Sequence, residues 1–390
     1  MTDHRSIATS NGPSVFLALE LSRSGWLVAI QCPSDGRVSR HKLTGGDVDG
    51  LLALIVRARS KAERAIGSPV ETICCHEAGY DGFWIHRRLE AAGIISHVID
   101  PASLQVDRRA RRVKTDVIDV EALLRAVMAY CRGEVQICRM VRPPTVEQED
   151  ARRLHRERHR LIKERVAHVN RIKGLLVTQS IYDFEPLRAS RREVLDALTT
   201  YDGRPVPPHL KQEVLREIDR LELALKQIHE VVAERDVVAA AETPRDGAET
   251  MIGQLMRLKS IGPETATVLV REVFYRSFAN RREVAAYAGL TPSPYRSGGM
   301  NRDQGISKAG NALVRAKMVE LAWMWMRYQP KSALACWFVE RVGAGKGRVR
   351  RIGIVAVARK LLVALWRYAT TGLVPSGALL KPGQPEALTA

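Results

Sequence analysis

Short apolar runs separated by polar turns open the chain. Residues 15–19, 26–31 and 38–42 have strand-like patterns, and the segments 22–25 and 33–36 between them have turn chemistry at hairpin spacing. A run that is too short for a helix and bounded by such turns is typical of a β-strand. We therefore predict three antiparallel strands at the start of the chain.

Helical and strand patterns alternate from residue 48 onward. Residues 48–65 and 82–92 have apolar positions at helical spacing, whereas residues 70–75 and 94–99 are compact apolar runs. This alternation favours a mixed sheet with right-handed crossovers, in which functional sites collect at strand ends. The pair Cys74-Cys75 lies inside one of the apolar runs, so we interpret both cysteines as core residues.

The middle of the chain has the pattern of long helices. Residues 146–179 are rich in charge and lack Gly and Pro until Gly174, which predicts one long helix. After the Pro-rich segment 204–208, apolar residues recur in alternating steps of four and three, as in a coiled-coil seam. They are Val214, Ile218, Leu221, Leu225, Ile228 and Val232. A helical hairpin packed on its own domain and a helix that pairs with a second chain both explain this seam.

A third, mostly helical region begins near residue 251. Residues 258–266 predict a helix, a Gly262-Pro263 turn and a second helix, whose first backbone N–H groups could bind a phosphate. A simple helix–turn–helix joint without a ligand has the same pattern. Further helical patterns extend to residue 327 and, after a basic segment at 346–351, to residue 368.

Net charge narrows the class of partner. The chain has 61 Lys and Arg against 43 Asp and Glu, a formal net charge of +18 and a pI near 10.0. Such a protein needs a polyanionic partner, and nucleic acid fits best. No segment reaches the roughly 18 uninterrupted apolar residues of a spanning helix, residues 1–13 lack a signal pattern, and the cysteine spacing suggests neither disulfides nor zinc. We expect a cytoplasmic protein without membrane association.

Four carboxylates are the candidate metal ligands. Glu20 and Glu77 end predicted strands, and Asp116 and Asp119 share one face of a predicted helix. Acids that converge from separate segments can hold a pair of Mg²⁺ ions against a phosphate. Each acid also has a simpler explanation, because Asp116 could cap its helix and Glu20 could be a surface turn residue.

A serine in a basic, glycine-rich turn is the candidate nucleophile. Ser297 precedes two glycines, and Arg296, Arg302 and Lys308 could stabilise its alkoxide and the attacked phosphate. Ser293 and Ser307 lie comparably near basic residues, so the pattern alone does not rank the three serines. Together the acids and the serine suggest DNA strand cleavage and joining.

A pair of histidines is the other possible metal motif. His155 and His159 lie at i and i+4 of the predicted long helix, but no third ligand is near them in sequence. We therefore interpret them as part of a solvated basic face.

Several motifs closely resemble those of the insertion-sequence 110 family of transposases. The stretches HEAGYDGFW (76–84), VIDP (98–101) and RVKTDVID (112–119) resemble the N-terminal domain of that family. Residues 261–266, 286–292, 297–298 and 306–311 look like its C-terminal transposase domain. The resemblance covers nearly the whole chain, in the order in which the family has these motifs.

The resemblance implies a fold class of α/β type in three domains. It implies a RuvC-like domain with an RNase H fold and a mixed sheet over residues 1–143. A long helical coiled-coil region would follow over 144–245. A mostly α-helical C-terminal transposase domain, with a helix-hairpin-helix-like segment and the serine, would occupy 246–390.

The resemblance also assigns roles to the candidate residues. The family's Asp-Glu-Asp-Asp tetrad, which binds Mg²⁺ (or Mn²⁺), carries over as Glu20 in place of the first Asp, then Glu77, Asp116 and Asp119. Its C-terminal serine carries over to Ser297, as a nucleophile that links transiently to DNA. The acidic domain of one protomer would complete the site of another, which implies a homodimer or homotetramer.

Nucleic acids are the implied partners. The resemblance implies donor and target DNA, a structured noncoding guide RNA that selects them, and a bacterial protein that joins the nucleoid when it is bound to DNA. Candidate nucleic-acid contacts are Lys114, Gly262, Arg296, Arg302, Lys308, Asn311 and Lys346. Two other classes stay open. One is a metal-dependent Holliday-junction-type nuclease without a covalent intermediate, and the other is a nonenzymatic architectural DNA-binding protein.

Overall fold

The computed structural model describes residues 12–104, 115–241, 250–297 and 300–381. The chain divides into two compact units, Met1–Thr145 and Val146–Ala390, which we call unit 1 and unit 2. The long central helices and the C-terminal helices belong to the same unit. The division of the chain into three domains stays a prediction.

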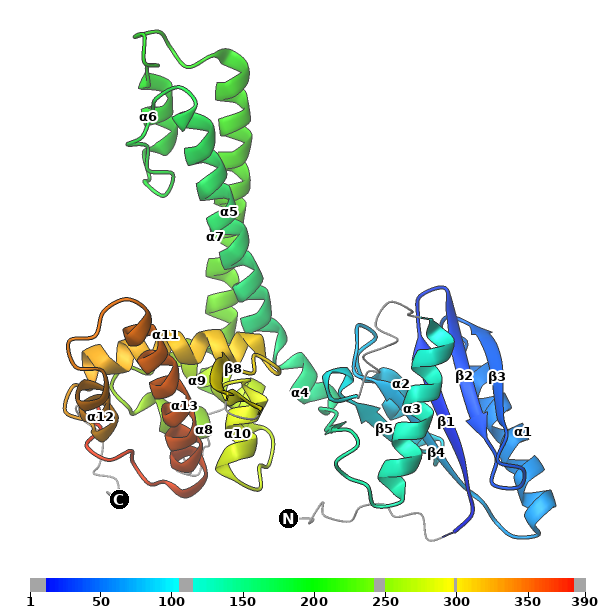
Figure 1. Ribbon diagram of the computed structural model, residues 1–390. Coiled ribbons are helices and arrows are strands. Elements are labelled where there is room, and N and C mark those ends of the chain that lie inside the picture. Colours follow the sequence, from blue (N-terminus) through cyan, green and yellow to red (C-terminus); the bar gives the residue numbers. More distant parts are fainter. Residues whose placement is uncertain (1–11, 105–114, 242–249, 298–299, 382–390) are drawn as a thin grey trace. The chain divides into compact units, whose positions relative to one another are not determined.

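Unit 1 is built around a mixed sheet. Within the described residues this sheet has six strands in the order β3-β2-β1-β4-β5-β6 (Figure 1). β1, β2 and β3 are antiparallel, β4 and β5 run parallel to β1, and β6 is antiparallel to β5. The strands are β1 Ser14–Leu21, β2 Gly25–Gln31, β3 Val38–Thr44, β4 Glu71–Glu77, β5 Ile95–Ile99 and β6 Met140–Val141. The predicted antiparallel strands and mixed sheet are confirmed.

Helices cover both faces of this sheet. α1 and α2 pack on one face, and α3 packs on the other. Because side chains alternate along a strand, Leu17 and Leu19 of β1 join the core under α1 and α2, whereas Ala18 joins the core under α3. Cys74 and Cys75 are fully buried on opposite faces, which confirms them as core residues. The bounds are α1 Val48–Ile66, α2 Trp84–Ala91, η1 Pro101–Ser103 and α3 Asp116–Cys131.

The long helix predicted at the start of unit 2 is interrupted. α4 (Val146–Asp150) and α5 (Arg153–Val177) are separate helices. Between them, the buried Arg152 donates from Nε to the backbone oxygen of Arg271 at 3.0 Å, and its guanidinium lies 4.1 Å from the ring centre of Tyr275. The prediction of one continuous helix is wrong, because a contact to a segment 119 residues away is made at this point of the chain.

α5 and α7 (Pro208–Ala241) lie side by side as a helical hairpin, with α6 (Arg191–Ala197) at its far end (Figure 1). Several positions of the predicted seam are buried between these two helices. They are Val214, Ile218 and Leu221 of α7, packed with Ile172 and Leu176 of α5. This part of the seam is therefore buried within the chain, as the hairpin alternative requires. Pairing with a second chain stays a prediction.

The C-terminal part of unit 2 forms a separate core of helices, to which a β-hairpin is attached. Trp325 and Tyr368 are among its largest fully buried side chains. Gly262 is the N-cap of α9 and Pro263 is its first residue, so the predicted Gly-Pro turn and the helix after it are confirmed, whereas the helix before the turn already ends at Met256. The elements are α8 Met251–Met256, α9 Pro263–Leu269, the π-helical turn η2 Val270–Phe274, α10 Arg281–Tyr287, β7 Pro292–Ser297, β8 Met300–Ile306, α11 Ala312–Tyr328, α12 Ala333–Val342 and α13 Arg348–Thr371. None of the described helices combines the length and apolarity that crossing a bilayer requires.

The hairpin packing predicts unequal effects of two substitutions on α7. Ile218→Ala should lower the free energy of unfolding by about 2–4 kcal/mol, because it removes methyl groups from a closed core. Leu223→Ala removes a side chain that is 55% exposed and should change it by less than about 0.5 kcal/mol. Denaturant unfolding of the full chain measures both. Equal losses would show that the Leu223 face is also buried, as in an intermolecular coil.

Candidate active site

Two of the candidate acids end neighbouring parallel strands on the same face of the sheet. Leu19 of β1 pairs with His76 of β4, so Glu20 and Glu77 follow side by side at the strand ends. Two residues earlier, Ala18 and Cys75 both pack in the core under α3. Because the side-chain period of a strand is two, Glu20 and Glu77 also lie on the α3 face.

The start of α3 lies at the same end of the sheet. Met128 and Cys131, near the end of α3, line one cavity with Ser14 and Phe16, at the start of β1. α3 therefore runs opposite to β1 and begins where β1 ends, as Figure 1 also shows. Its first turn carries Asp116 and Asp119. The structure thus brings all four candidate acids to one end of the α3 face.

Glu77 and Asp119 lie at nearly the same level along the strand direction. The Cys75 thiol contacts the backbone oxygen of Leu123 at 3.6 Å. From this contact, Glu77 lies two residues, about 6.6 Å, further along β4, and Asp119 lies four residues, about 6 Å, back along α3. Within the described residues, however, no three His, Cys, Asp or Glu side chains are grouped closely enough to hold a metal ion. Metal binding therefore stays a prediction.

Thr115, not Asp116, caps α3. The Thr115 hydroxyl oxygen accepts a hydrogen bond from the backbone N–H of Ile118 at 3.3 Å. The alternative in which Asp116 is the cap is therefore wrong. Asp116 is exposed and Asp119 is half-buried. Both carboxylates lie in the first helical turn, where the helix dipole stabilises negative charge.

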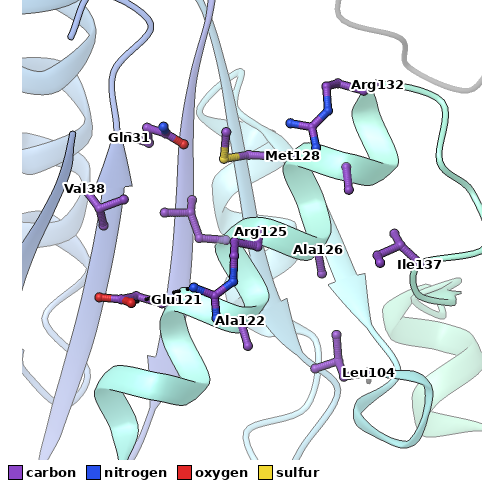
Figure 2. Close-up of a pocket in the computed structure, with 12 residues that line it drawn as sticks. Gln31, Val38, Leu104, Glu121, Ala122, Arg125, Ala126, Met128, Arg132 and Ile137 are labelled. Atoms are coloured by element: carbon purple, nitrogen blue, oxygen red, sulfur yellow. Dashed lines mark ion pairs between the residues drawn. The ribbon is translucent and has the colours of Figure 1, made fainter. Parts of the chain in front are cut away.

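A cavity of about 560 Å³ lies against α3, away from these acids (Figure 2). Gln31 and Val38 line it from the sheet, and α3 lines it from Glu121 to Arg132. Glu121 forms an ion pair with Arg125 at 3.8 Å on this wall. None of the four candidate acids lines the cavity, so it is separate from the candidate active site.

An arginine–tyrosine pair joins the two loops that follow the strand-end acids. Arg23 follows β1 and Tyr80 follows β4. The Arg23 Nε donates to the Tyr80 hydroxyl at 2.9 Å, and the guanidinium lies 5.0 Å from the ring centre. The sequence prediction missed this pair, although both residues lie three positions beyond a candidate acid. Its effect is to hold the loops after Glu20 and Glu77 together.

Ser297 is the last residue of β7 and pairs with Met300 of β8. The serine therefore lies at the tip of the antiparallel β7–β8 hairpin, and the two glycines of the predicted turn lie outside the described residues. Lys114 lies outside the described residues, as do the side chains of Ser297 and Arg302. The role of Ser297 as a nucleophile stays a prediction.

The two rival serines lie elsewhere in the hairpin. Ser293 lies near the start of β7, where the register shifts between Pro292 and Pro294. The Ser307 backbone N–H donates to the Thr291 backbone oxygen at 2.8 Å, and its hydroxyl oxygen accepts from the Thr291 hydroxyl at 3.3 Å. Both serines are thus at the base of the hairpin, whereas Ser297 is at its tip.

At the predicted phosphate-binding site near Gly262, a carboxylate of the protein itself lies at the helix start. Glu264, in the first turn of α9, pairs with Arg158 at 2.8 Å and with Arg235 at 2.7 Å. A carboxylate at a helix start already uses the favourable dipole there. Among the other predicted contacts, Arg296, Lys308 and Lys346 are exposed, as binding to nucleic acid requires.

A buried carboxylate in η2 links three segments of unit 2. Glu272 accepts from His155 Nε2 at 2.8 Å, from Arg156 Nε at 2.6 Å and from Asn311 Nδ2 at 2.9 Å. His155 is buried, so its interpretation as part of a solvated face is wrong. Asn311, the N-cap of α11, also accepts from the backbone N–H of Val314 at 3.1 Å. Its side chain is thus used within the protein.

A family model connects this part of the chain to known proteins. The model described as the IS116/IS110/IS902 transposase family matches residues 253–335. This match contains η2 with Glu272, the hairpin that ends in Ser297, and α11. The C-terminal core therefore has the sequence pattern of a transposase.

Similarity to individual transposases extends over most of the chain. The chain is 50% identical to the predicted transposase y4rJ of Sinorhizobium fredii over 375 residues. This alignment covers 94% of the chain and 95% of the relative. The chain is 27% identical to the transposase for insertion sequence element IS1328 of Yersinia enterocolitica, over 67% of this chain and 73% of that protein. The transposase for insertion sequence element IS1111A of Coxiella burnetii is 26% identical to the chain, over 73% of this chain and 74% of that protein. The chain belongs to the IS110 family of transposases, as its motifs predicted.

The Glu272 network predicts an acid-sensitive contribution to stability. Burial alone would raise the pKa of Glu272, but hydrogen bonds and charge from His155 and Arg156 hold that pKa below its usual 4.5. A group with a lowered pKa in the folded state stabilises the fold fully above its unfolded pKa, and this contribution is lost as the pH falls below it. The free energy of unfolding should therefore decrease below pH 4.5.

Glu272→Gln should lower the free energy of unfolding at pH 7 by roughly 3 kcal/mol and should flatten its dependence on pH below 4.5. Glu157→Gln, an exposed site on α5, is the control and should leave both unchanged. Denaturant unfolding between pH 3 and 7, roughly the range in which a glutamate titrates, measures the effect. An unchanged acid-side slope in Glu272→Gln would contradict the role of this carboxylate.

Proposed function

We propose that this transposase cleaves, exchanges and rejoins DNA strands for the movement of an insertion sequence. The observation that carries the proposal is the position of the four acids. Glu20 and Glu77 share one end of the α3 face, and α3 begins at that end with Asp116 and Asp119. The strand order and the helices on both faces are consistent with the RuvC-like RNase H fold that the motifs imply.

The four carboxylates fit the donor set of Mg²⁺ or Mn²⁺, because both ions prefer oxygen ligands. When bound, the ions would stabilise the negative charge that develops on the phosphate oxygens. Glu20 has one methylene group more than the family's Asp, which moves its charge outward without removing it.

The Ser297 hydroxyl would attack the phosphorus of the DNA backbone. The hydroxyl loses its proton as a bond forms from Oγ to phosphorus, the bond from phosphorus to the leaving sugar oxygen breaks, and that oxygen takes up a proton. Rejoining is the reverse attack by a hydroxyl of another strand. Each step replaces one phosphoester bond by another, so strand exchange needs no ATP.

Donor and target DNA would be the substrates, and a structured noncoding guide RNA would select both by base pairing. The net charge of +18 suits binding to both kinds of nucleic acid. The acids of one protomer would act with Ser297 of another in a homodimer or homotetramer. The hairpin of α5 and α7 would then act as a spacer between catalytic parts.

The metal proposal predicts a selective loss of cleavage. Asp119→Asn should lower strand cleavage at least roughly a hundredfold, because several kcal/mol of charge stabilisation depend on the bound ions, and it should leave DNA binding unchanged. Glu121→Gln, on the same helix but paired with Arg40 at 3.2 Å, is the matched control and should retain activity. Gel assays of cleavage with Mg²⁺, Mn²⁺ or EDTA test this. Cleavage in EDTA would contradict the proposal.

The nucleophile proposal predicts a covalent protein–DNA adduct at Ser297. Denatured reaction mixtures should contain this adduct, and peptide mass spectrometry should locate it on the β7–β8 hairpin. Ser297→Ala should abolish the adduct, whereas Ser293→Ala and Ser307→Ala should retain it. Cleavage without any adduct would indicate a purely hydrolytic nuclease. Mixing Ser297→Ala protein with Asp116→Asn protein should restore part of the activity if the site is shared between protomers.

A further inference from the structure

A wide groove lies in unit 2 between the start of α10, strand β8, α12 and one face of α13. Its volume is about 1140 Å³, which is above the roughly 300–1,000 Å³ of sites for small molecules. Arg348, Ile352, Val355, Arg359 and Val363 line it from α13. They are spaced by three or four residues and so form one stripe of the helix. The groove is large enough for a polymer segment.

The charged side chains that line the groove are positive. Among the residues that the structure describes, seven cationic side chains and no carboxylate line it; the cations are Arg281, Arg282, Lys308, Arg348, Arg351, Arg359 and Lys360. Lys360 Nζ lies 4.5 Å from the ring centre of Trp337, which also lines the groove. Seven neighbouring positive charges repel one another unless an anion binds between them. The groove therefore calls for a polyanion.

Several other cations of unit 2 are neutralised within the protein. Arg171 pairs with Glu213 at 2.6 Å, and Arg192 pairs with Glu222 at 2.7 Å. By contrast, in the described part of the chain none of the seven groove cations forms an ion pair with a carboxylate. What distinguishes the groove is that seven such cations line one cavity.

Apolar side chains also line the groove. They include Leu290, Trp337, Ile352, Val355 and Val363, of which Ile352 is 59% exposed. A DNA duplex presents phosphates and hides its bases in the stack, so it gains little from these apolar side chains. The unstacked bases of a single strand can cover apolar and aromatic side chains while the phosphates contact the cations. The combination favours single-stranded nucleic acid.

The groove adjoins the hairpin that carries Ser297. Pro292 and Ile306 both line the groove and pair with each other at the base of that hairpin. Five residues of strand separate Pro292 from Ser297, which is roughly 17 Å. A strand in the groove would thus lie a few nucleotides from a phosphate at the hairpin tip.

We propose that this groove binds a single-stranded segment of the DNA that Ser297 cleaves. The choice of DNA rests on the proposed function, whereas the charge and the apolar lining of the groove stand independently of it. An unpaired segment next to the scissile phosphate is what strand exchange requires, because the strand must leave one partner before it joins another.

Binding is tested in full-length Ser297→Ala protein, which cannot form the adduct. The double substitution Arg351→Ala/Arg359→Ala removes two cations from the groove. It should weaken binding of a short single-stranded DNA oligonucleotide roughly tenfold or more, and it should lower the salt slope by about 2, one for each lost phosphate contact. The double substitution Arg350→Ala/Arg367→Ala makes the same charge change on α13 outside the groove and is the matched control. It should have a much smaller effect.

Fluorescence anisotropy with the single strand, its duplex, the RNA of the same sequence and vesicles containing phosphatidylserine separates the possible ligands. The groove variant should lose affinity mainly for the single-stranded DNA. A loss confined to duplex, RNA or vesicles would overturn the proposal, as would equal losses in groove and control variants. Photo-crosslinking of bromouracil-containing DNA to the otherwise unaltered chain should map to residues 348–363, which tests the site without a groove substitution. If the adduct forms at Ser297 but the crosslinks map elsewhere, the proposed binding of a single strand in the groove is contradicted, whereas the proposed function is not.

Discussion

The alternation of side chains across the central strands of unit 1 is the constraint on which the candidate active site depends. In β1 and β4, the register that buries Ala18 and Cys75 under α3 also brings Glu20 and Glu77 to the same face. A slip of either strand by one residue would move its carboxylate to the face of α1 and α2. The packing of α3 over this core therefore fixes both the fold and the end at which Asp119 meets the strand acids.

Charge is organised in two ways in unit 2. Carboxylates such as Glu264 and Glu272 neutralise cations at the junctions between helices, and there they stabilise the scaffold. Cations on α13, such as Arg351 and Arg359, line a groove to which no described residue contributes a carboxylate. This gathering of cations concentrates positive potential where a polyanion can bind. The hairpin with Ser297 adjoins this region of positive charge.

Local patterns predicted the parts of the structure that depend on near neighbours. The strands before Glu20 and Glu77 follow from short apolar runs between turns, and their parallel pairing brings both acids to one end. The pattern could not predict the burial of His155, because its partner Glu272 is 117 residues away. The break at Arg152 has the same cause. The groove is assembled from four separate segments, and no single stretch of sequence carries its signal.

We expect Glu20, Glu77, Asp116 and Asp119 together to hold divalent metal ions at one end of the α3 face. An anomalous-scattering map from crystals of the protein with DNA and Mn²⁺ would locate these ions. Manganese peaks should be bounded by the carboxylates of β1, β4 and the first turn of α3. Peaks at another site, or none at these acids in a complex that cleaves DNA, would contradict this expectation.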